Sequence, residues 1–330
     1  MTNETSNDTT EEMDRIRCEY YAVSGSTWND CVFLGMRYDE LTGFRSNRGE
    51  CWILRNEPEG EDGAGFWTER GSSTLLTGIW RSPKRAVFVS GAALLYNSDM
   101  AAPGAENAWQ QHDVFAGMAF MGVWGLSDDC VFTWGTEWEG PNRLFRFNGK
   151  QWRETPAPGF RITALHGIAP DCLTAVGEFG EAARFHANRW QIFPTPVRER
   201  LTSVFMVSAD QIYAVGAGGS VLEGSSAGWG KIAEGPKLPT GDGAALRAVA
   251  WWQGELWIGG GVTGLWKRVG KTNRLESVNK NITAVDFDSR EELLIAEEYR
   301  ITSTRDGVEF NSGAFHALEQ QRDGKALMEW

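Results

Sequence analysis

The stretch ITALHGIAPDCLTAVGEFGEAARFHANRWQI, residues 162–192, contains the structural unit from which this chain is built. Its first segment alternates in polarity, and the Ala-Pro-Asp that follows is a turn. Three further apolar segments succeed one another, separated by short polar turns. The predicted strands occupy residues 162–168, 172–177, 182–186 and 189–192. Four short antiparallel strands within about 40 residues are typical of a β-propeller blade.

The second strand of this unit recurs along the whole chain, in most copies ending in Gly. The copies are Val32–Gly35, Val87–Gly91, Val131–Gly135, Leu173–Gly177, Ile212–Gly216, Leu256–Gly259 and Leu293–Ala296. A spacing of about 40 residues indicates a propeller or another repeat array. We predict an all-β, closed β-propeller of seven four-stranded blades. The alternative is eight blades, because residues 316–328 resemble the start of a further unit; this segment is either a degenerate eighth unit or the part of the chain that closes the ring.

The propeller is expected to occupy residues 15–330 as a single domain. Residues 1–14 are polar and acidic, and we expect them to form a disordered tail. They contain no apolar run, and the chain has no apolar stretch of membrane-spanning length, so no secretory signal and no membrane association are expected. A cytoplasmic location follows as the default expectation.

Tryptophan and cysteine also follow the repeat. Trp67, Trp109, Trp152, Trp190 and Trp229 lie about 40 residues apart, at the expected outer strands. We predict that these rings wedge between neighbouring blades, with Phe310 taking this part in the last blade. Three of the five Cys precede the Gly-ending strand at equivalent positions: Cys31, Cys130 and Cys172. They are expected to be buried apolar residues rather than disulfides or metal ligands.

Charge and motifs exclude several classes of function. The formal net charge is −12, which disfavours nucleic acid and favours a basic protein partner or a cationic ligand. The four His show no metal-ligand spacing, and the Gly-rich segments lack the Lys-Ser/Thr of a phosphate-binding loop. We therefore expect no metal, no cofactor and no nucleic acid.

The third copy carries a family resemblance. Residues 123–152 follow the pattern V-W-G-x-S-x-D-x-V-x-x-x-G, then L-x-R-F-N-G-x-x-W. This pattern resembles the repeat of Trp/Gly-rich bacterial β-propellers, which are similar to BNR/Asp-box and photosystem-assembly-factor-like propellers. Residues 303–310 resemble a degraded Asp-box hairpin. The resemblance implies a propeller fold, and since such propellers include sialidases, assembly factors and binding proteins, it implies no single activity.

Acidic and aromatic residues share the loops between the second and third strands, which should emerge on one face of the disc. The candidate partner-binding residues there are Tyr38, Glu137, Trp138, Glu139, Glu178, Phe179, Glu181, Glu297 and Tyr299. Aromatic anchors ringed by acids fit a basic protein surface. We predict a non-enzymatic protein-binding scaffold, such as an immunity or adaptor protein.

The alternative is a glycan-active enzyme, sialidase- or lyase-like, with its site at the mouth of the central channel. Tyr299 follows Glu297 and precedes Arg300, which is the nearest local match to a tyrosine nucleophile with an acidic partner. His166 lies on a predicted inner strand, where it either faces the channel or is satisfied within the sheet. No residue is assigned as catalytic, and the enzyme question stays open, with a non-enzyme favoured.

Overall fold

The computed structural model describes residues 16–313, except 40, 42–49, 61–62, 73, 85, 93, 98–108, 113–116, 138–139 and 235–245. These residues form β-strands and two short 3-10 turns, η1 (Trp28–Asp30) and η3 (Gly261–Thr263), without any α-helix. No helix in this part of the chain could therefore span a bilayer. The prediction of an all-β propeller is confirmed, whereas residues 1–14 and 316–328 lie outside the described part.

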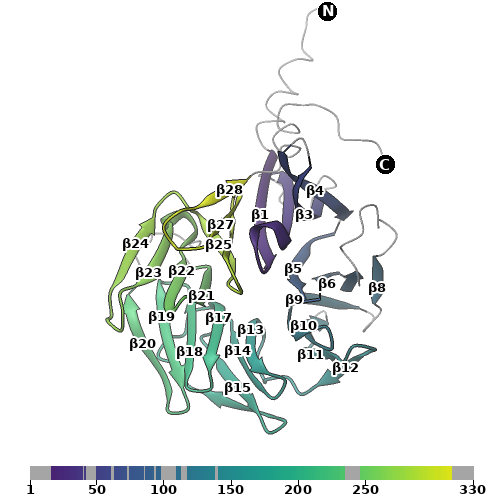
Figure 1. The fold of residues 1–330 in the computed structure, drawn as a ribbon. Helices are drawn as coiled ribbons and strands as arrows, with labels where there is room; N and C mark the ends of the chain where they lie inside the picture. Colours follow the sequence, from purple (N-terminus) through teal and green to yellow (C-terminus); the bar gives the residue numbers. More distant parts are fainter. Residues whose placement is uncertain are drawn as a thin grey trace, which may run out of the picture.

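Seven four-stranded sheets stand around a central axis as blades (Figure 1). Each sheet consists of four strands consecutive in sequence, paired antiparallel. The strands of the first four sheets are β1 (Ile16–Gly25), β2 (Cys31–Asp39), β3 (Glu50–Gly60) and β4 (Gly63–Ser72); β5 (Leu76–Arg81), β6 (Val87–Gly91), β7 (Leu94–Asn97) and β8 (Gln110–His112); β9 (Met118–Ser127), β10 (Cys130–Glu137), β11 (Asn142–Phe147) and β12 (Trp152–Thr155); and β13 (Ile162–Ala169), β14 (Cys172–Gly177), β15 (Ala182–His186) and β16 (Arg189–Phe193).

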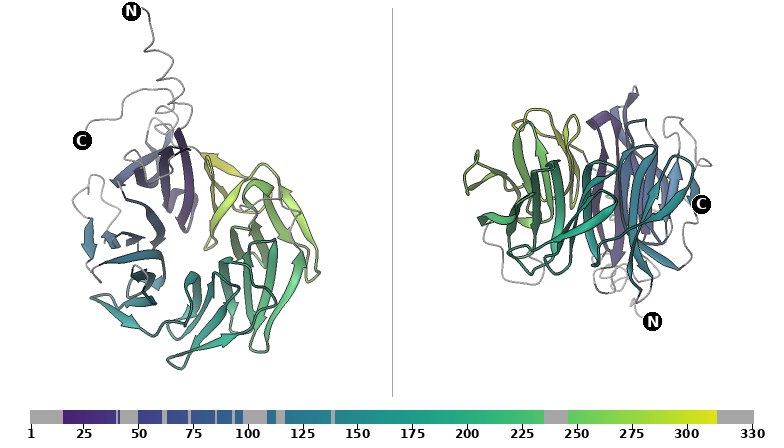
Figure 2. Two further views of the ribbon diagram at one scale, coloured as in Figure 1. Left: turned by 180° about the vertical axis from the view of Figure 1, so that it is seen from behind. Right: turned by 90° about the horizontal axis from the view of Figure 1, so that it is seen from below.

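The remaining sheets follow the same plan. Their strands are β17 (Leu201–Ser208), β18 (Gln211–Gly216), β19 (Ser220–Ser225) and β20 (Gly228–Glu234); β21 (Ala248–Trp252), β22 (Glu255–Gly259), β23 (Leu265–Arg268) and β24 (Leu275–Asn279); and β25 (Ala284–Asp288), β26 (Leu293–Glu297), β27 (Ile301–Thr304) and β28 (Asn311–Gly313). The blades are numbered below in this chain order. Figure 2 shows the ring from behind and from below.

The antiparallel order gives the disc two distinct faces. The first strand of every blade lines the central channel, and these strands run in the same direction. The loops between second and third strands, together with the connections between blades, therefore emerge on one side, which we call the loop face. The hairpin turns between first and second strands, and between third and fourth, emerge on the other side, the turn face.

Apolar clusters between neighbouring sheets form the core, and the outer-strand tryptophans contribute to them. Trp152 of the third blade contacts Phe88 of the second at 6.1 Å between ring centroids. Trp190 packs on the cluster shared by the third and fourth blades, and Trp229 on that shared by the fourth and fifth. Phe310 packs on the cluster between the sixth and seventh blades. The predicted wedges are confirmed for these rings.

Cysteine side chains are packed in the same core. Cys31, Cys51 and Cys130 are buried and Cys172 is half-buried, and none of these four forms a disulfide. Burial raises the pKa of the Cys31 thiol to about 12, so it stays a neutral, apolar group. The described residues contain no His/Cys/Asp/Glu cluster able to hold a metal ion.

Threonine hydroxyls join the inner strands of successive blades. Thr163 on β13 donates to the carbonyl of Leu201 at 2.6 Å, and Thr202 on β17 donates to the carbonyl of Leu246 at 2.6 Å. Thr77 on β5 does the same to Phe120, at 2.9 Å. Each bond satisfies a polar group of the channel wall within the protein, so the repeat uses its hydroxyls structurally.

The ring closes where the seventh blade packs on the first, by side-chain hydrogen bonds and two backbone hydrogen bonds, without exchange of a strand among the described residues. Asp288 Oδ2 on β25 accepts from the Ser24 hydroxyl and the Gly25 N–H, both at 3.0 Å. Arg290 pairs with the same carboxylate at 2.6 Å and donates to the carbonyl of Arg81 in the second blade at 2.7 Å. One carboxylate–guanidinium pair thus ties three blades together.

Candidate functional sites: the loop face and the central channel

Exposed apolar side chains gather on the loop face. Eight large apolar or aromatic residues are exposed in the described part of the chain, and five belong to this face: Leu41, Leu75, Phe179, Val262 and Tyr299. The other three lie on strands or on the turn face. These five residues come from loops of different blades, so the loop face carries more exposed apolar side chains than the turn face.

Phe179 is the most prominent of these groups because its loop is rigid. The ring is 73 % exposed, although the Phe179 N–H donates to Glu181 Oε2 at 2.6 Å. Gly177 and Glu181 close the loop by a backbone hydrogen bond of 3.0 Å. Gly180 has φ +75°, and its carbonyl accepts from the Thr195 hydroxyl at 2.6 Å. These bonds fix the backbone of the loop, on which the Phe179 side chain is exposed to solvent.

A groove of about 510 Å³ adjoins this loop, between the third and fourth blades. Thr136 to Asn142 supply one wall, apart from residues 138 and 139, and Ala157 to Arg161 supply the other. Arg161 pairs with Glu178 at 3.7 Å, which joins the groove to the Phe179 loop. The predicted anchor Trp138 and its neighbour Glu139 lie outside the described residues.

Several candidate residues have other roles than the sequence indicated. Tyr38 was expected in a loop but belongs to β2, because the pairing of β1 with β2 continues as far as Ile16 and Asp39. Its hydroxyl donates to Glu19, and burial, followed by this contact, raises the tyrosine pKa. Tyr38 is thus half-buried and already engaged.

Glu297 is a structural residue rather than a surface one. It is 1 % exposed, and its carboxylate accepts from the Thr283 N–H at 3.1 Å, Arg300 Nε at 2.9 Å and the Thr302 hydroxyl. These bonds hold the last loop in place. Above it Tyr299 is exposed, with its hydroxyl bonded to Glu298 at 2.7 Å.

Arginines neutralise much of the acidity predicted for this face. Glu137 Oε1 accepts from Arg143 at 2.6 Å, and Arg143 also pairs with Glu154 at 2.7 Å. Glu178 and Glu297 have their own arginine partners, as described above. Apolar exposure, more than negative charge, therefore distinguishes the loop face.

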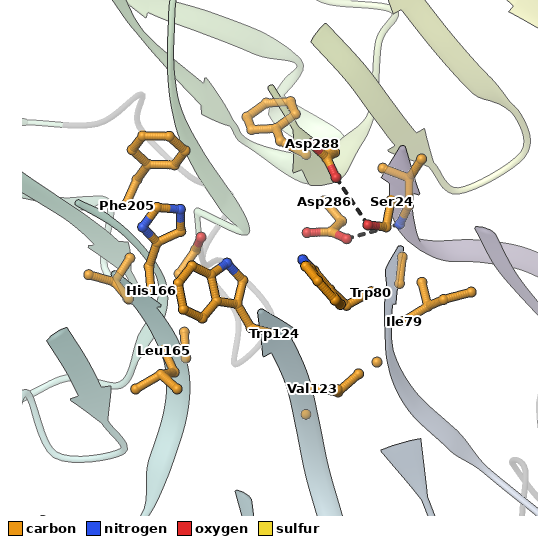
Figure 3. A pocket seen from close by; sticks show the side chains of 18 of the residues that line it. Ser24, Ile79, Trp80, Val123, Trp124, Leu165, His166, Phe205, Asp286 and Asp288 are labelled. Carbon is orange, nitrogen blue, oxygen red and sulfur yellow. Dashed lines mark hydrogen bonds between the residues drawn. The ribbon is translucent and has the colours of Figure 1, made fainter. Parts of the chain in front are cut away.

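The central channel is a second concave site, with a volume of about 500 Å³. Equivalent positions of the inner strands face it, so the repeat itself sets its composition. These positions hold Ser24, Trp80, Trp124, His166, Phe205 and Asp288, and Asp286 faces the channel two residues before Asp288 (Figure 3). One side of the channel is aromatic and the other is acidic.

The aromatic side is a row of rings on consecutive blades. His166 lies between Trp124 and Phe205, with centroid distances of 4.9 and 4.3 Å. Its Nδ1 accepts from the Met206 N–H at 3.1 Å, which places the proton of the neutral ring on Nε2. Burial lowers the pKa of His166 to about 4, so the row carries no charge at neutral pH. His166 is thus both channel-facing and bonded within the wall.

Trp80 extends this row toward the first blade. Its ring lies across Gly125 of the third blade, where a Cβ would come within 2.8 Å of the indole. The glycine therefore makes room for the ring, which is 7 % exposed. A flat aromatic surface results on the wall between β5 and β9.

The acidic side belongs to β25 of the last blade. Asp286 Oδ2 accepts from the Val23 N–H at 3.0 Å, whereas Asp288 is paired with Arg290. Burial raises the pKa of Asp286 to about 7; the N–H groups of Val23 and Phe287 offset part of that shift. Asp286 has no ion-pair partner among the described residues. In Figure 3 its carboxyl group points into the channel, toward Trp124 and Trp80.

Comparison with known proteins supports the fold and goes no further. No family model matches the chain, and no curated protein matches it. Among solved structures, YCF48 bound to a D1 peptide shares 13 % identity at a TM-score of 0.54, covering 86 % of this chain and 90 % of that one. YCF48 from Cyanidioschyzon merolae shares 15 % at a TM-score of 0.50, covering 73 % and 85 %. The WD40 propeller domain of Doa1 shares 8 % at a TM-score of 0.61, covering 84 % and 89 %.

At such low identity these likenesses show a common β-propeller architecture. The expected similarity to photosystem-assembly-factor-like propellers is confirmed at the level of the fold.

Proposed function

We propose that this chain is a non-enzymatic protein-binding scaffold that engages its partner through the loop face. The observation that carries the proposal is Phe179, an exposed ring on a loop fixed at both ends. A rigid aromatic anchor binds with little loss of conformational entropy, which is typical of interface hot spots. The adjoining groove between the third and fourth blades offers concave surface beside the anchor.

The partner is proposed to be a basic protein, with the chain acting as an immunity or adaptor protein. The support for a basic partner is the net charge of −12, which would speed the encounter of oppositely charged proteins. Because Glu137 and Glu178 are paired with arginines, affinity should depend more on apolar contact than on salt. Trp138 and Glu139, in the loop beside the groove, are proposed as further contacts.

Two solved neighbours are compatible with this proposal, since one is YCF48 with a bound D1 peptide and another is a WD40 domain. The glycan-active alternative has weaker support. Its proposed acidic residue, Glu297, is buried beneath the surface and fully occupied by Arg300, Thr302 and Thr283.

Quantitative affinity capture with matched variants tests the proposal. The chain, Phe179→Ala and Ile192→Ala would be compared as baits in lysate of the native host, with captured proteins measured by mass spectrometry. Ile192 is the control because it is an exposed apolar residue on β16 of the same blade, away from the loop face. Loss of an anchor typically costs about 2 kcal/mol, or about thirtyfold in affinity.

We expect the same basic proteins with the chain and with Ile192→Ala, and their depletion with Phe179→Ala. Binding of the recovered partner would then be measured with purified proteins, including Trp138→Ala. Equal capture by the chain and Phe179→Ala would contradict the proposed face. Capture of acidic proteins alone would contradict the basic partner while leaving the face intact.

A further inference from the structure

We propose that the central channel binds an organic cation, such as an alkylammonium or guanidinium group, between its aromatic row and Asp286. This site is separate from the loop face. Its volume of about 500 Å³ lies within the range of small-ligand sites, and residues from all seven blades line it.

The aromatic row supplies faces for such a cation. Trp80, Trp124 and Phe205 come from three blades and border the same space (Figure 3). Two of these rings are held by their surroundings. Trp80 lies across Gly125, and Trp124 stacks on Phe132 with the ring centroids 6.3 Å apart. A cation within about 6 Å of such a ring is attracted by its negative face, most strongly where water is excluded.

Asp286 supplies the charge. Its neighbour Asp288 is neutralised by Arg290, whose guanidinium is also bonded to Ser24 and Arg81. No basic side chain of the described part pairs with Asp286, so the desolvated carboxyl lacks a counterion. A bound cation would serve as that counterion and remove the penalty that keeps the carboxyl protonated.

The channel wall fits a cation better than a sugar. A sugar needs several hydrogen-bonding groups, but Thr77, Thr163 and Thr202 donate to carbonyls of neighbouring blades. Ser203 accepts from the Val249 N–H. Besides the Asp288–Arg290 pair and Arg247, the wall therefore offers aromatic rings and the Asp286 carboxylate, which are the components of a cation cage.

Cation binding should strengthen as the pH rises from 6 to 8, because Asp286 ionises with a pKa near 7. The other charged or titratable groups that line the channel are Tyr21, His166, Asp288, Arg290 and Arg247, and burial raises the pKa of Tyr21, so this phenol stays neutral. His166 titrates near pH 4 and stays neutral in this range, and Arg290 is committed to Asp288. The pH profile therefore reports Asp286.

Isothermal titration calorimetry of the full chain at pH 8 tests the site. Choline is the probe, and its neutral carbon isostere 3,3-dimethylbutan-1-ol is the control ligand. Five-residue glycine peptides with a central Lys, Arg or norleucine distinguish a partner's side chain from a free small molecule. The variants are Asp286→Asn, Phe205→Leu and, as control, the exposed turn-face substitution Asp171→Asn.

We expect choline or a cationic peptide to bind, at least tenfold more tightly than its neutral counterpart. Asp286→Asn should weaken binding at least tenfold while keeping an acceptor for the Val23 N–H, and Asp171→Asn should change nothing. Phe205→Leu should weaken binding severalfold. This second variant tests the site if Asp286→Asn folds poorly. If only choline binds, the natural ligand of the channel is a small molecule. If the Lys or Arg peptide binds, the ligand is a side chain of a partner protein. Equal binding of the neutral probes, unchanged binding by Asp286→Asn, or no binding of any cation at about 10 mM would overturn the proposal.

Discussion

Replacing Arg290 with Met should destabilise the whole ring, because it removes the guanidinium that ties the last blade to the first two. Arg290 donates to both Asp288 oxygens, at 3.0 and 2.6 Å, and to the carbonyl of Arg81 at 2.7 Å. A fourth bond, of 3.1 Å, goes to the Ser24 hydroxyl. The variant leaves the Asp288 carboxylate in place without its cation.

The expected cost follows from the burial of the pair. Breaking a fully buried pair typically costs about 3–5 kcal/mol, and breaking an exposed one about 0.2–1 kcal/mol. The side chains of Arg290 and Asp288 are 28 % and 14 % exposed, and Asp288 keeps its bonds to Ser24 and Gly25. We therefore expect a loss of about 2–3 kcal/mol, which lowers the melting temperature by about 3–4 °C for a chain of this size.

Urea unfolding and calorimetry measure this loss. Lys267→Met is the control, since Lys267 makes only surface pairs with Glu255 and Glu276, each at 3.5 Å. It should cost less than about 1 kcal/mol. Adding Asp288→Asn to Arg290→Met should recover about 1 kcal/mol, because the unpaired charge disappears. If Arg290→Met loses no more than Lys267→Met, or if the two channel substitutions are simply additive, the closure does not depend on this pair.

Two further predictions concern the core and the channel. Trp152→Ala should lower the free energy of unfolding in urea by about 3 kcal/mol, the low end for a large aromatic residue, because the ring is only half-buried. The ring packs on Phe88, and its Nε1 donates to His112 at 2.9 Å. An unchanged urea midpoint would contradict its role as a wedge. Between pH 4.5 and 6.5 the effects of His166 and Asp286 on stability should oppose each other. His166 titrates below its ordinary value of 6.5, so acid favours the unfolded chain, whereas Asp286 titrates above its ordinary value of 3.8, so acid favours the folded chain. Relative to the unmodified chain, the free energy of unfolding of Asp286→Asn should therefore fall by about 1 kcal/mol when the pH is lowered from 6 to 5. Urea unfolding at both pH values measures this difference. Parallel pH profiles of the two proteins would contradict the assignment.

The fold was largely predictable because the repeat consists of local sequence patterns. A strand ending in Gly, a polar turn and an outer aromatic recur at a fixed spacing, and each pattern depends on neighbours within the same blade. Strand ends were less predictable. The sequence of residues 36–39 predicted a loop, but these residues form the end of β2. Their pairing depends on how far β1 extends, which the local sequence does not indicate.

The candidate sites were predicted less well, for reasons of three-dimensional context. The burial of Glu297 depends on Thr302 and Thr283, which the sequence pattern does not bring together. The channel residues could have been found, because Trp124, His166 and Asp288 occupy equivalent inner-strand positions, and Asp286 lies two residues before Asp288. Aligning the first strands of all the blades would have shown aromatic rings on consecutive blades and the two aspartates of the last blade. The lack of a counterion for Asp286 could not be read in this way.

The contiguity of the blades has a mechanical consequence. Because every described sheet is made from one uninterrupted segment, no strand crosses the boundary between the seventh and first blades. Side-chain contacts hold it, together with two backbone hydrogen bonds, from the Tyr20 N–H to the Glu298 carbonyl and from the Glu292 N–H to the Ser26 carbonyl. Tension applied to β1 and β28 would act first on the few polar contacts across that boundary. The β-ladders within the sheets would be sheared only later. The ring should therefore yield first by opening into an arc with its sheets intact, and only afterwards unravel one sheet at a time.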